Sequence, residues 1–161
     1  MPDSNITKRA LAQAMKELMR TEPFSKISVG DICQACSMSR KSFYYHFRDK
    51  YDLVNWIFDS EFLQTIRPEA YHSGWALLAD MCAYFYREQT FYRTALLISG
   101  QNSFREYFGQ AIAPIMSFFA QDIFDGVEHV DFYVTFFSDA ILISIIRWLT
   151  EGAQIPPEEY L

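Results

Sequence analysis

The first twenty residues carry a helical pattern of apolar and polar positions. Between Ile6 and Arg20 the apolar side chains recur every three or four residues, at Leu11, Ala14, Met15, Leu18 and Met19. Charged residues fill the rest of the turn, so one face is apolar and the other is polar. The pattern predicts an amphipathic helix over 6–20, which ends at "TEPFSK" because Pro23 cannot continue the hydrogen-bond ladder.

Two shorter helices are predicted between residues 28 and 47. In "SVGDICQA", Ser28 is placed to cap a helix and Asp31 to complete a capping box. After a break at 36–38, Ser39 is a good N-cap for a second helix. Phe43 and Phe47 lie four residues apart on the core face of that helix. The segment therefore reads as helix, three-residue turn, helix.

The rest of the chain is also helical in its pattern. Asp49, with Asp52 three residues later, caps a fourth helix that runs towards Pro68. Beyond it the apolar period predicts helices at about 73–88, 90–99, 103–124 and 130–150. No strand alternation stands out. We predict an all-α fold in which a three-helix helix-turn-helix domain is joined by a linker helix to a C-terminal helical bundle.

Charge divides the chain at about residue 50. The net charge is −6, yet residues 1–50 hold nine Lys/Arg against five Asp/Glu, and all five lysines lie there. Attraction to phosphate is short-ranged at physiological salt, so a local positive field on an acidic body suits a nucleic-acid partner. We therefore predict a DNA-binding head over residues 1–50 and a regulatory and dimerisation domain over 66–161.

The outward face of the second short helix suits base and phosphate contacts. Arg40 and Lys41 lie at its amino terminus, the part of a recognition helix that reaches base edges. Hydroxyl, imidazole and ammonium donors near them suit phosphate oxygens. The predicted DNA-binding residues are Ser28, Ser39, Arg40, Lys41, Ser42, Tyr44, Tyr45, His46 and Lys50. The alternative, a solvated helix with an aromatic core stripe, is less favoured because capping, charge and outward tyrosines agree.

Residues 6–65, above all "ISVGDICQACSMSRKSFYYHFRDKYDLV", resemble the amino-terminal domain of the TetR family of bacterial transcriptional regulators. The resemblance implies a homodimer on a palindromic operator of double-stranded DNA. Matched by position, the resemblance implies that Ser28 contacts a phosphate and that Arg40, Lys41 and Ser42 face the bases. It implies that the DNA backbone is contacted by Tyr44, Tyr45, His46 and Lys50. The family usually has glycine where this chain has Cys36, and a non-glycine residue at positive φ there would be strained.

A second, looser resemblance concerns the body. The stretch "SGQNSFREYF", residues 99–108, and the short chain after the linker are similar to the subgroup that includes regulators of dihydroxyacetone-kinase operons. This resemblance implies a short helical body that receives its signal from a small-molecule effector or from a protein co-regulator. Weak candidates for a ligand pocket are Tyr71, Trp75, Tyr86 and Tyr92, although core packing explains each of them as well.

The segment 130–150 is apolar around most of its circumference, so it must be enclosed. We predict that it forms a two-fold four-helix interface with helix 103–124, in which Phe108, Ile112, Ile115, Phe119 and Phe124 take part. The alternative is the central helix of a monomeric bundle. No apolar run is judged long and charge-free enough to span a bilayer, and no leader is visible, so we expect a cytoplasmic protein without membrane contact.

Other reactive residues do not gather into a site. Cys33 and Cys36 form a lone C-x-x-C without the further ligands that structural zinc needs, so core packing is favoured over redox sensing. His46, His72 and His129 are far apart, and no serine has a nucleophile-elbow context. We therefore predict no metal, no cofactor and no catalytic residue, and an enzyme is kept only as a formal third possibility.

Overall fold

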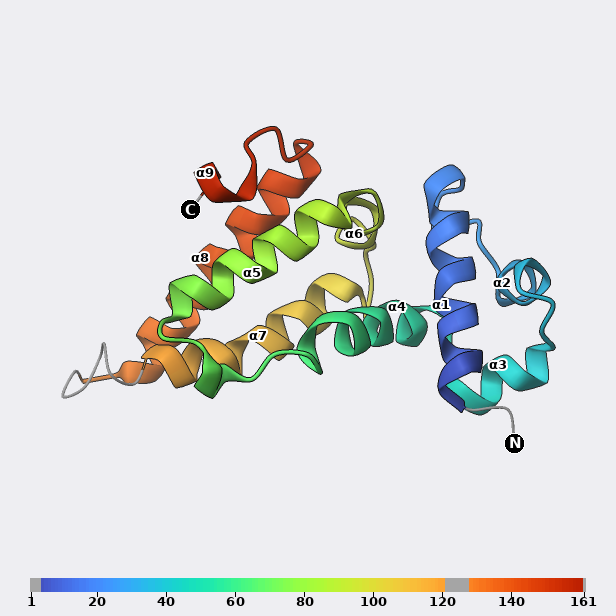
Figure 1. Ribbon diagram of the computed structural model, residues 1–161, viewed down its shortest axis with the longest axis horizontal. Coiled ribbons are helices and arrows are strands. Elements are labelled where there is room, and N and C mark those ends of the chain that lie inside the picture. The colour runs from blue at the N-terminus through green and yellow to red at the C-terminus, as the bar shows by residue number, and fades with distance from the viewer. Residues whose placement is uncertain (1–3, 121–127, 161) are drawn as a thin grey trace.

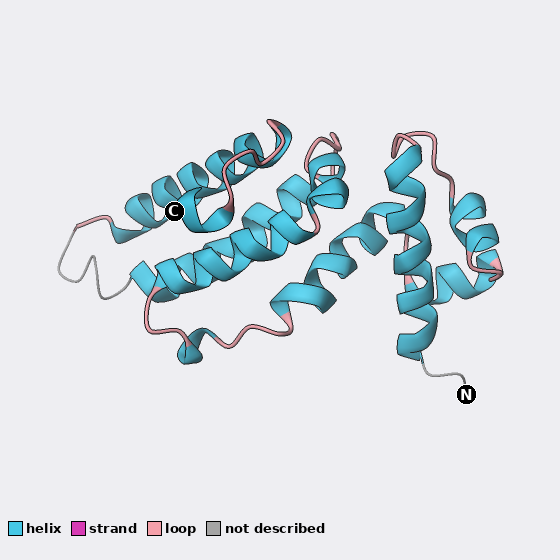
Figure 2. Ribbon diagram, turned by 45° about the horizontal axis from the view of Figure 1, so that its top comes forward, coloured by secondary structure: helices cyan, strands magenta, loops and turns pink. Residues whose placement is uncertain are grey.

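The computed structural model describes residues 4–120 and 128–160, and every regular element in these ranges is a helix. The head holds α1 (Ser4–Thr21), α2 (Val29–Ala35) and α3 (Arg40–His46), followed by α4 (Lys50–Phe58). The body holds α5 (Gly74–Arg87), α6 (Gln89–Ala95), α7 (Phe104–Ala120), α8 (Val130–Thr150) and α9 (Pro157–Tyr160). Figure 1 shows the head at one end of an elongated molecule, with α4 leading into the body, and Figure 2 shows the same helices from a second direction.

The helices begin where their capping side chains predict. Ser39 Oγ accepts a hydrogen bond from the Ser42 amide at 3.1 Å, and Asp49 Oδ1 accepts one from Asp52 at 2.8 Å. At Ser28 both halves of the predicted capping box are present. The predicted all-α fold is confirmed. The last predicted residues of helix 103–124, with Phe124, lie outside the described residues.

Two elements depart from the sequence-based prediction. The linker helix does not stay α-helical but passes into a π-helical turn, η1 (Asp59–Leu63), before a 3-10 turn, η2 (Pro68–Ala70). At the other end of the body, α9 folds back so that Tyr160 stacks on Trp148, with ring centroids 4.7 Å apart. Each depends on contacts between distant parts of the chain rather than on local pattern.

An aromatic cluster joins the linker to the body. Phe58, the last residue of α4, is fully buried. Its ring lies within 6.4 Å, centroid to centroid, of the rings of Phe62, Tyr84, Phe85, Tyr92, Phe104 and Phe108. Aromatic rings that pack edge-on or offset contribute beyond their buried area. The linker helix is therefore fixed in the core of the body at its carboxyl end.

The turn between α2 and α3 corrects the prediction about Cys36. Cys36 has φ −110°, and the left-handed residue is Ser37, with φ 55°. The Met38 amide donates to Cys33 O at 2.8 Å and the Ser37 amide to Gln34 O at 3.2 Å, which is the Schellman pattern. Cys36 Sγ donates to Ile32 O at 3.3 Å. The strained position is thus one residue later than the sequence comparison predicts.

Replacing Ser37 by glycine is expected to stabilise the protein. An L-residue in the left-handed conformation costs roughly 1–2 kcal/mol, and glycine avoids this cost. The greater entropy of glycine in the unfolded chain removes about 0.5–1 kcal/mol of that gain. We expect the free energy of unfolding in urea to rise by about 0.5–1 kcal/mol. Ala35→Gly, inside α2, is the control and should lower it by about 1 kcal/mol. A Ser37→Gly protein that is no more stable than the parent would contradict this account.

Helix α8 is only partly enclosed. Among the described helices it alone is long and apolar enough to cross a membrane by length and composition, which contradicts the prediction that no such run exists. Only 28% of its most apolar window is buried. The charged residues Asp131, Asp139 and Arg147 interrupt the apolar sequence of this helix. Its exposed apolar side chains include Phe132, Phe136, Phe137 and Ile143. The prediction of an enclosed helix therefore requires a further surface to cover this face.

Candidate DNA-binding surface

Helix α3 is short and is anchored to the head by its buried face. It has seven residues, begins after the Ser39 cap, and packs fully buried Phe43 against the head. Phe47, at the C-cap, is also buried. On the opposite face Tyr44 is 59% exposed and Tyr45 is 83% exposed. The arrangement presents a basic and aromatic surface on a rigid support.

Arg40 lies against the first turn of α2. A β-carbon added at Gly30 would be 2.5 Å from Arg40 Nη2, so a larger residue at position 30 would push the guanidinium out of this place. Lys41, beside it on α3, is exposed. The two cations therefore lie at the junction of α2 and the amino terminus of α3. Gly30 is a contributor that sequence reasoning missed, since its role depends on a contact between two helices.

The predicted hydroxyl contacts are partly engaged already. Ser28 Oγ donates to Asp31 Oδ2 at 2.6 Å and accepts from the Asp31 amide at 3.2 Å. The Asp31 carboxylate accepts hydrogen bonds from the Ser28 hydroxyl and, at 2.8 Å, from the Ser28 amide. These two bonds lower the pKa of Asp31, so the carboxylate stays ionised at neutral pH. Ser42 is half-buried and its amide bonds the Ser39 cap. Of this group Ser39 is exposed and keeps its hydroxyl hydrogen for another acceptor.

His46 and Lys50 lie at the edge of the surface. Burial, with Lys8 nearby, lowers the pKa of His46, so at neutral pH the imidazole acts as a neutral hydrogen-bonding group. Its Nδ1 lies 3.5 Å from Ser4 Oγ.

Lys50 Nζ donates to Phe24 O and Ile27 O, both at 2.7 Å, and lies over the Phe24 ring. Lys50 thus ties the start of α4 to the loop between α1 and α2, and two of its three N–H donors are used. Arg48, which the prediction omitted, has a side chain that is 85% exposed beside the end of α3.

The weak ligand candidates do not come together. Tyr92 is fully buried and its hydroxyl lies 2.7 Å from that of Tyr84, so it belongs to the core. Trp75 is exposed, while Tyr71 donates to Asp80 at 2.9 Å. Tyr86 stacks on Trp148. The four residues occupy separate places and form no common pocket.

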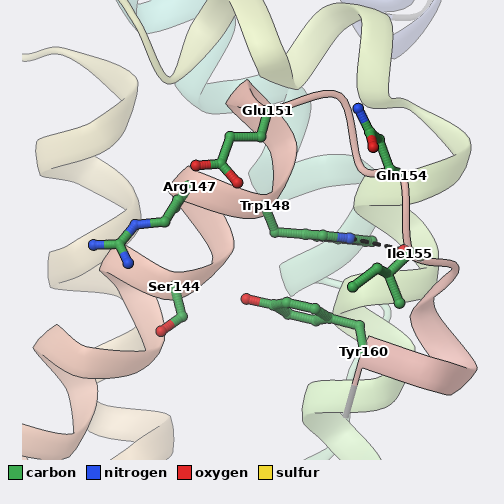
Figure 3. A pocket seen from close by; sticks show the side chains of 7 residues that line it. All are labelled: Ser144, Arg147, Trp148, Glu151, Gln154, Ile155 and Tyr160. Carbon is green, nitrogen blue, oxygen red and sulfur yellow. Dashed lines mark hydrogen bonds between the residues drawn. The ribbon is translucent and has the colours of Figure 1, made fainter.

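A surface groove of about 670 Å³ lies elsewhere in the body, between the end of α8 and the returning chain. Figure 3 shows its lining of Ser144, Arg147, Trp148, Glu151, Gln154, Ile155 and Tyr160. Trp148 Nε1 donates to Ile155 O at 2.8 Å, which fixes one wall. None of the predicted ligand residues lines it.

The thiols are placed for packing. Cys33 and Cys82 are buried, and Cys36 is half-buried. Burial raises the pKa of Cys33 and Cys36, and raises the pKa of Cys82 to about 12. The reactive thiolate is therefore scarce at neutral pH, which fits the interpretation of these residues as small apolar groups.

Comparison with known proteins decides the family. Residues 7–57 match the model for bacterial regulatory proteins of the tetR family, and residues 75–161 match a model for a transcriptional regulator C-terminal region. The chain belongs to the TetR family. This confirms the sequence-based assignment to a family of transcriptional regulators that bind DNA operators, and not to an enzyme family.

This TetR-family chain is similar in sequence to a transcriptional activator. It is 32% identical over 109 residues, 67% of this chain, to the HTH-type dhaKLM operon transcriptional activator DhaS of Lactococcus lactis, and spans 57% of that protein's length.

Solved structures share the fold. A dihydroxyacetone kinase operon activator DhaS has a TM-score of 0.73 at 24% identity, covering 97% of this chain and 90% of its own. NalD, the secondary repressor of the MexAB-OprM multidrug efflux pump in Pseudomonas aeruginosa, has a TM-score of 0.66 at 19% identity, covering 98% and 91%.

Proposed function

We propose that this TetR-family regulator binds a palindromic operator as a homodimer in the bacterial cytoplasm, with α3 of each subunit in the major groove. The observation that carries the proposal is the exposed basic and aromatic face of α3 above buried Phe43. Arg40 and Lys41 reach base edges, where arginine can bond guanine through two hydrogen bonds. Tyr44 and Tyr45 contact the phosphate backbone beside the groove.

The remaining predicted contacts take secondary roles in this proposal. Ser39 offers its hydroxyl hydrogen, and His46 acts as a neutral group. Ser28 can reach phosphate only by giving up its bond to Asp31. Lys50 has one N–H left for phosphate, so its main contribution is to support the head.

The second subunit is proposed to cover the exposed side of α8. Recognition helices of a dimer must reach half-sites roughly 34–36 Å apart on one face of the duplex. The first turns of α8 and the last turns of α7 lie at the end of the molecule away from the head (Figure 1). An isologous contact between two α7–α8 pairs would enclose Phe132, Phe136 and Ile143.

We propose that the body controls the DNA affinity. A small-molecule effector would bind the body of one conformation better than that of another and so change the separation of the heads. The packed aromatic core around Tyr92 and the open form of the Trp148 groove favour the second candidate, a protein co-regulator that docks on the body surface. Two measurements distinguish these candidates. Co-purification with the product of a neighbouring gene would support a protein co-regulator, and a change of DNA affinity on titration with a small metabolite would support an effector.

Replacing Arg40 and Lys41 together by alanine tests the proposed function. Each lost base contact should cost about 1–3 kcal/mol on the specific site and little on random DNA. The double variant should therefore lose discrimination between the DNA upstream of its own gene and a scrambled duplex, measured by fluorescence anisotropy. Arg105→Ala, which removes an exposed cation from the body, is the control and should keep it. Unchanged discrimination in the double variant would refute the proposed reading surface.

A further inference from the structure

Three charged side chains from three parts of the chain meet at the junction of head and body. Lys16 Nζ on α1 lies 2.8 and 2.7 Å from the two carboxylate oxygens of Glu61, on η1. It also lies 3.2 Å from Glu88 Oε2, at the break between α5 and α6. One cation of the head therefore binds two carboxylates of the linker and body.

The cluster is partly shielded from water. The Lys16 side chain is 14% exposed, and those of Glu61 and Glu88 are 36% and 29% exposed. The ammonium also lies 5.8 Å from the centre of the Phe91 ring, where α1 packs against α6. Ion pairs that are withdrawn from solvent are weakly screened by salt, and removing one partner leaves the others uncompensated.

Glu61 connects this ion pair to the core. Tyr84 OH donates to Glu61 Oε2 at 2.9 Å and lies 2.7 Å from Tyr92 OH. Both tyrosines are buried in the aromatic cluster that holds Phe58. A polar chain thus runs without interruption from α1 of the head through Glu61 into the centre of the body.

The π-helical turn brings Glu61 into this position. It is closed by an i→i+5 hydrogen bond from the Gln64 amide to Asp59 O at 2.8 Å. A π-helical turn inserts one residue into an α-helix and so changes the direction of the side chains beside it, and such turns are frequent at functional sites. Here the turn follows Phe58 directly, at the point where the linker enters the body, and its Glu61 contacts Lys16 of the head.

We infer that Lys16 is a positioning residue for operator binding, which holds the head at one angle to the body by its ion pairs to Glu61 and Glu88. This rests on the proposed homodimer, because the angle of each head sets the distance between the two copies of α3. Lys16 itself does not contact DNA in this account. Its loss should weaken recognition of half-site spacing and leave recognition of a single half-site intact.

The test uses the full chain with Lys16→Met, which keeps the length of the side chain and removes its charge. An operator is first selected from random duplexes with the parent protein, and half-site spacing is then varied by single base pairs. We expect the variant to bind an isolated half-site as tightly as the parent does. The ratio of its affinity for the best spacing to its affinity for the neighbouring spacings should fall roughly tenfold. Arg20→Met removes a cation of the same helix whose partner, Glu17, is on that helix, and should behave as the parent.

Glu61→Gln provides a second, milder variant should Lys16→Met fold poorly, and it should reduce the spacing preference in the same direction. A parent protein with a sharp spacing preference that Lys16→Met and Glu61→Gln both retain would overturn this inference alone. A parent protein without any spacing preference would overturn the proposed dimer on a palindrome, and the inference with it. Loss of half-site binding in a folded variant would show that Lys16 acts within the head, and would also overturn the inference.

Discussion

Replacing Phe136 by glutamate is expected to convert the protein to a monomer at micromolar concentration and to lower its affinity for the palindromic operator by about 100-fold or more. Phe136 is 57% exposed on α8 and its ring stacks on that of Phe132, with centroids 6.3 Å apart. In an isologous interface every substitution occurs twice, so two carboxylates would be buried against an apolar surface. Sedimentation velocity measures the mass, and anisotropy measures the DNA affinity.

The control for this variant is Leu97→Glu. Leu97 is a comparably exposed apolar residue after α6, outside the proposed interface, so its replacement should leave the mass unchanged. Affinity of Phe136→Glu for an isolated half-site should also be retained, because α3 is untouched. A Phe136→Glu protein that still sediments as a dimer would show that α8 is covered in some other way.

Replacing Phe58 by alanine is expected to lower the free energy of unfolding by about 3–5 kcal/mol, a large part of the total stability of a domain of this size. The Phe58 ring is in contact with six other rings from η1, α5, α6 and α7, so its removal leaves a cavity that rigid neighbours cannot fill. Chemical denaturation followed by circular dichroism measures the change.

Trp75→Ala is the matched control for Phe58→Ala. Trp75 is also a large aromatic residue, but it is mostly exposed on α5, so its loss should change the stability by less than about 1 kcal/mol. If Phe58→Ala unfolds at the same denaturant concentration as Trp75→Ala, the aromatic cluster does not support the body in the way its geometry indicates.

Local features of the fold are predictable from sequence because their causes are local. Ser28, Ser39 and Asp49 each cap the helix that their position predicts, and a cap needs only a few consecutive residues. The buried position of Phe43 follows from helical spacing in the same way. These features also carry the family resemblance, so the amino-acid sequence is sufficient to assign the family.

Features that depend on distant partners are not predictable in this way. The sequence pattern assigns Lys50 to DNA, but its ammonium is held by the carbonyls of Phe24 and Ile27, more than twenty residues earlier. Tyr92 is a candidate for a pocket by its residue type, and instead closes the core beside Tyr84. In sequence, Lys16 is one of several cations on an amphipathic helix. In each case the sequence gives the residue type, but only the folded structure shows which group the side chain contacts.

The hydrogen bonds from Lys50 to the carbonyls of Phe24 and Ile27 have a mechanical consequence. The first residue of α4 moves with the head, and Phe58 at the end of α4 moves with the body. At a rise of 1.5 Å per residue the helix between them is a lever arm roughly 12 Å long, so a rotation of about 10° displaces one end by roughly 2 Å. Two such levers in a dimer change the distance between the recognition helices by about one base-pair step, ~3.4 Å. A rotation of α4 by this amount relative to the body is therefore enough to move the protein from one operator register to the next.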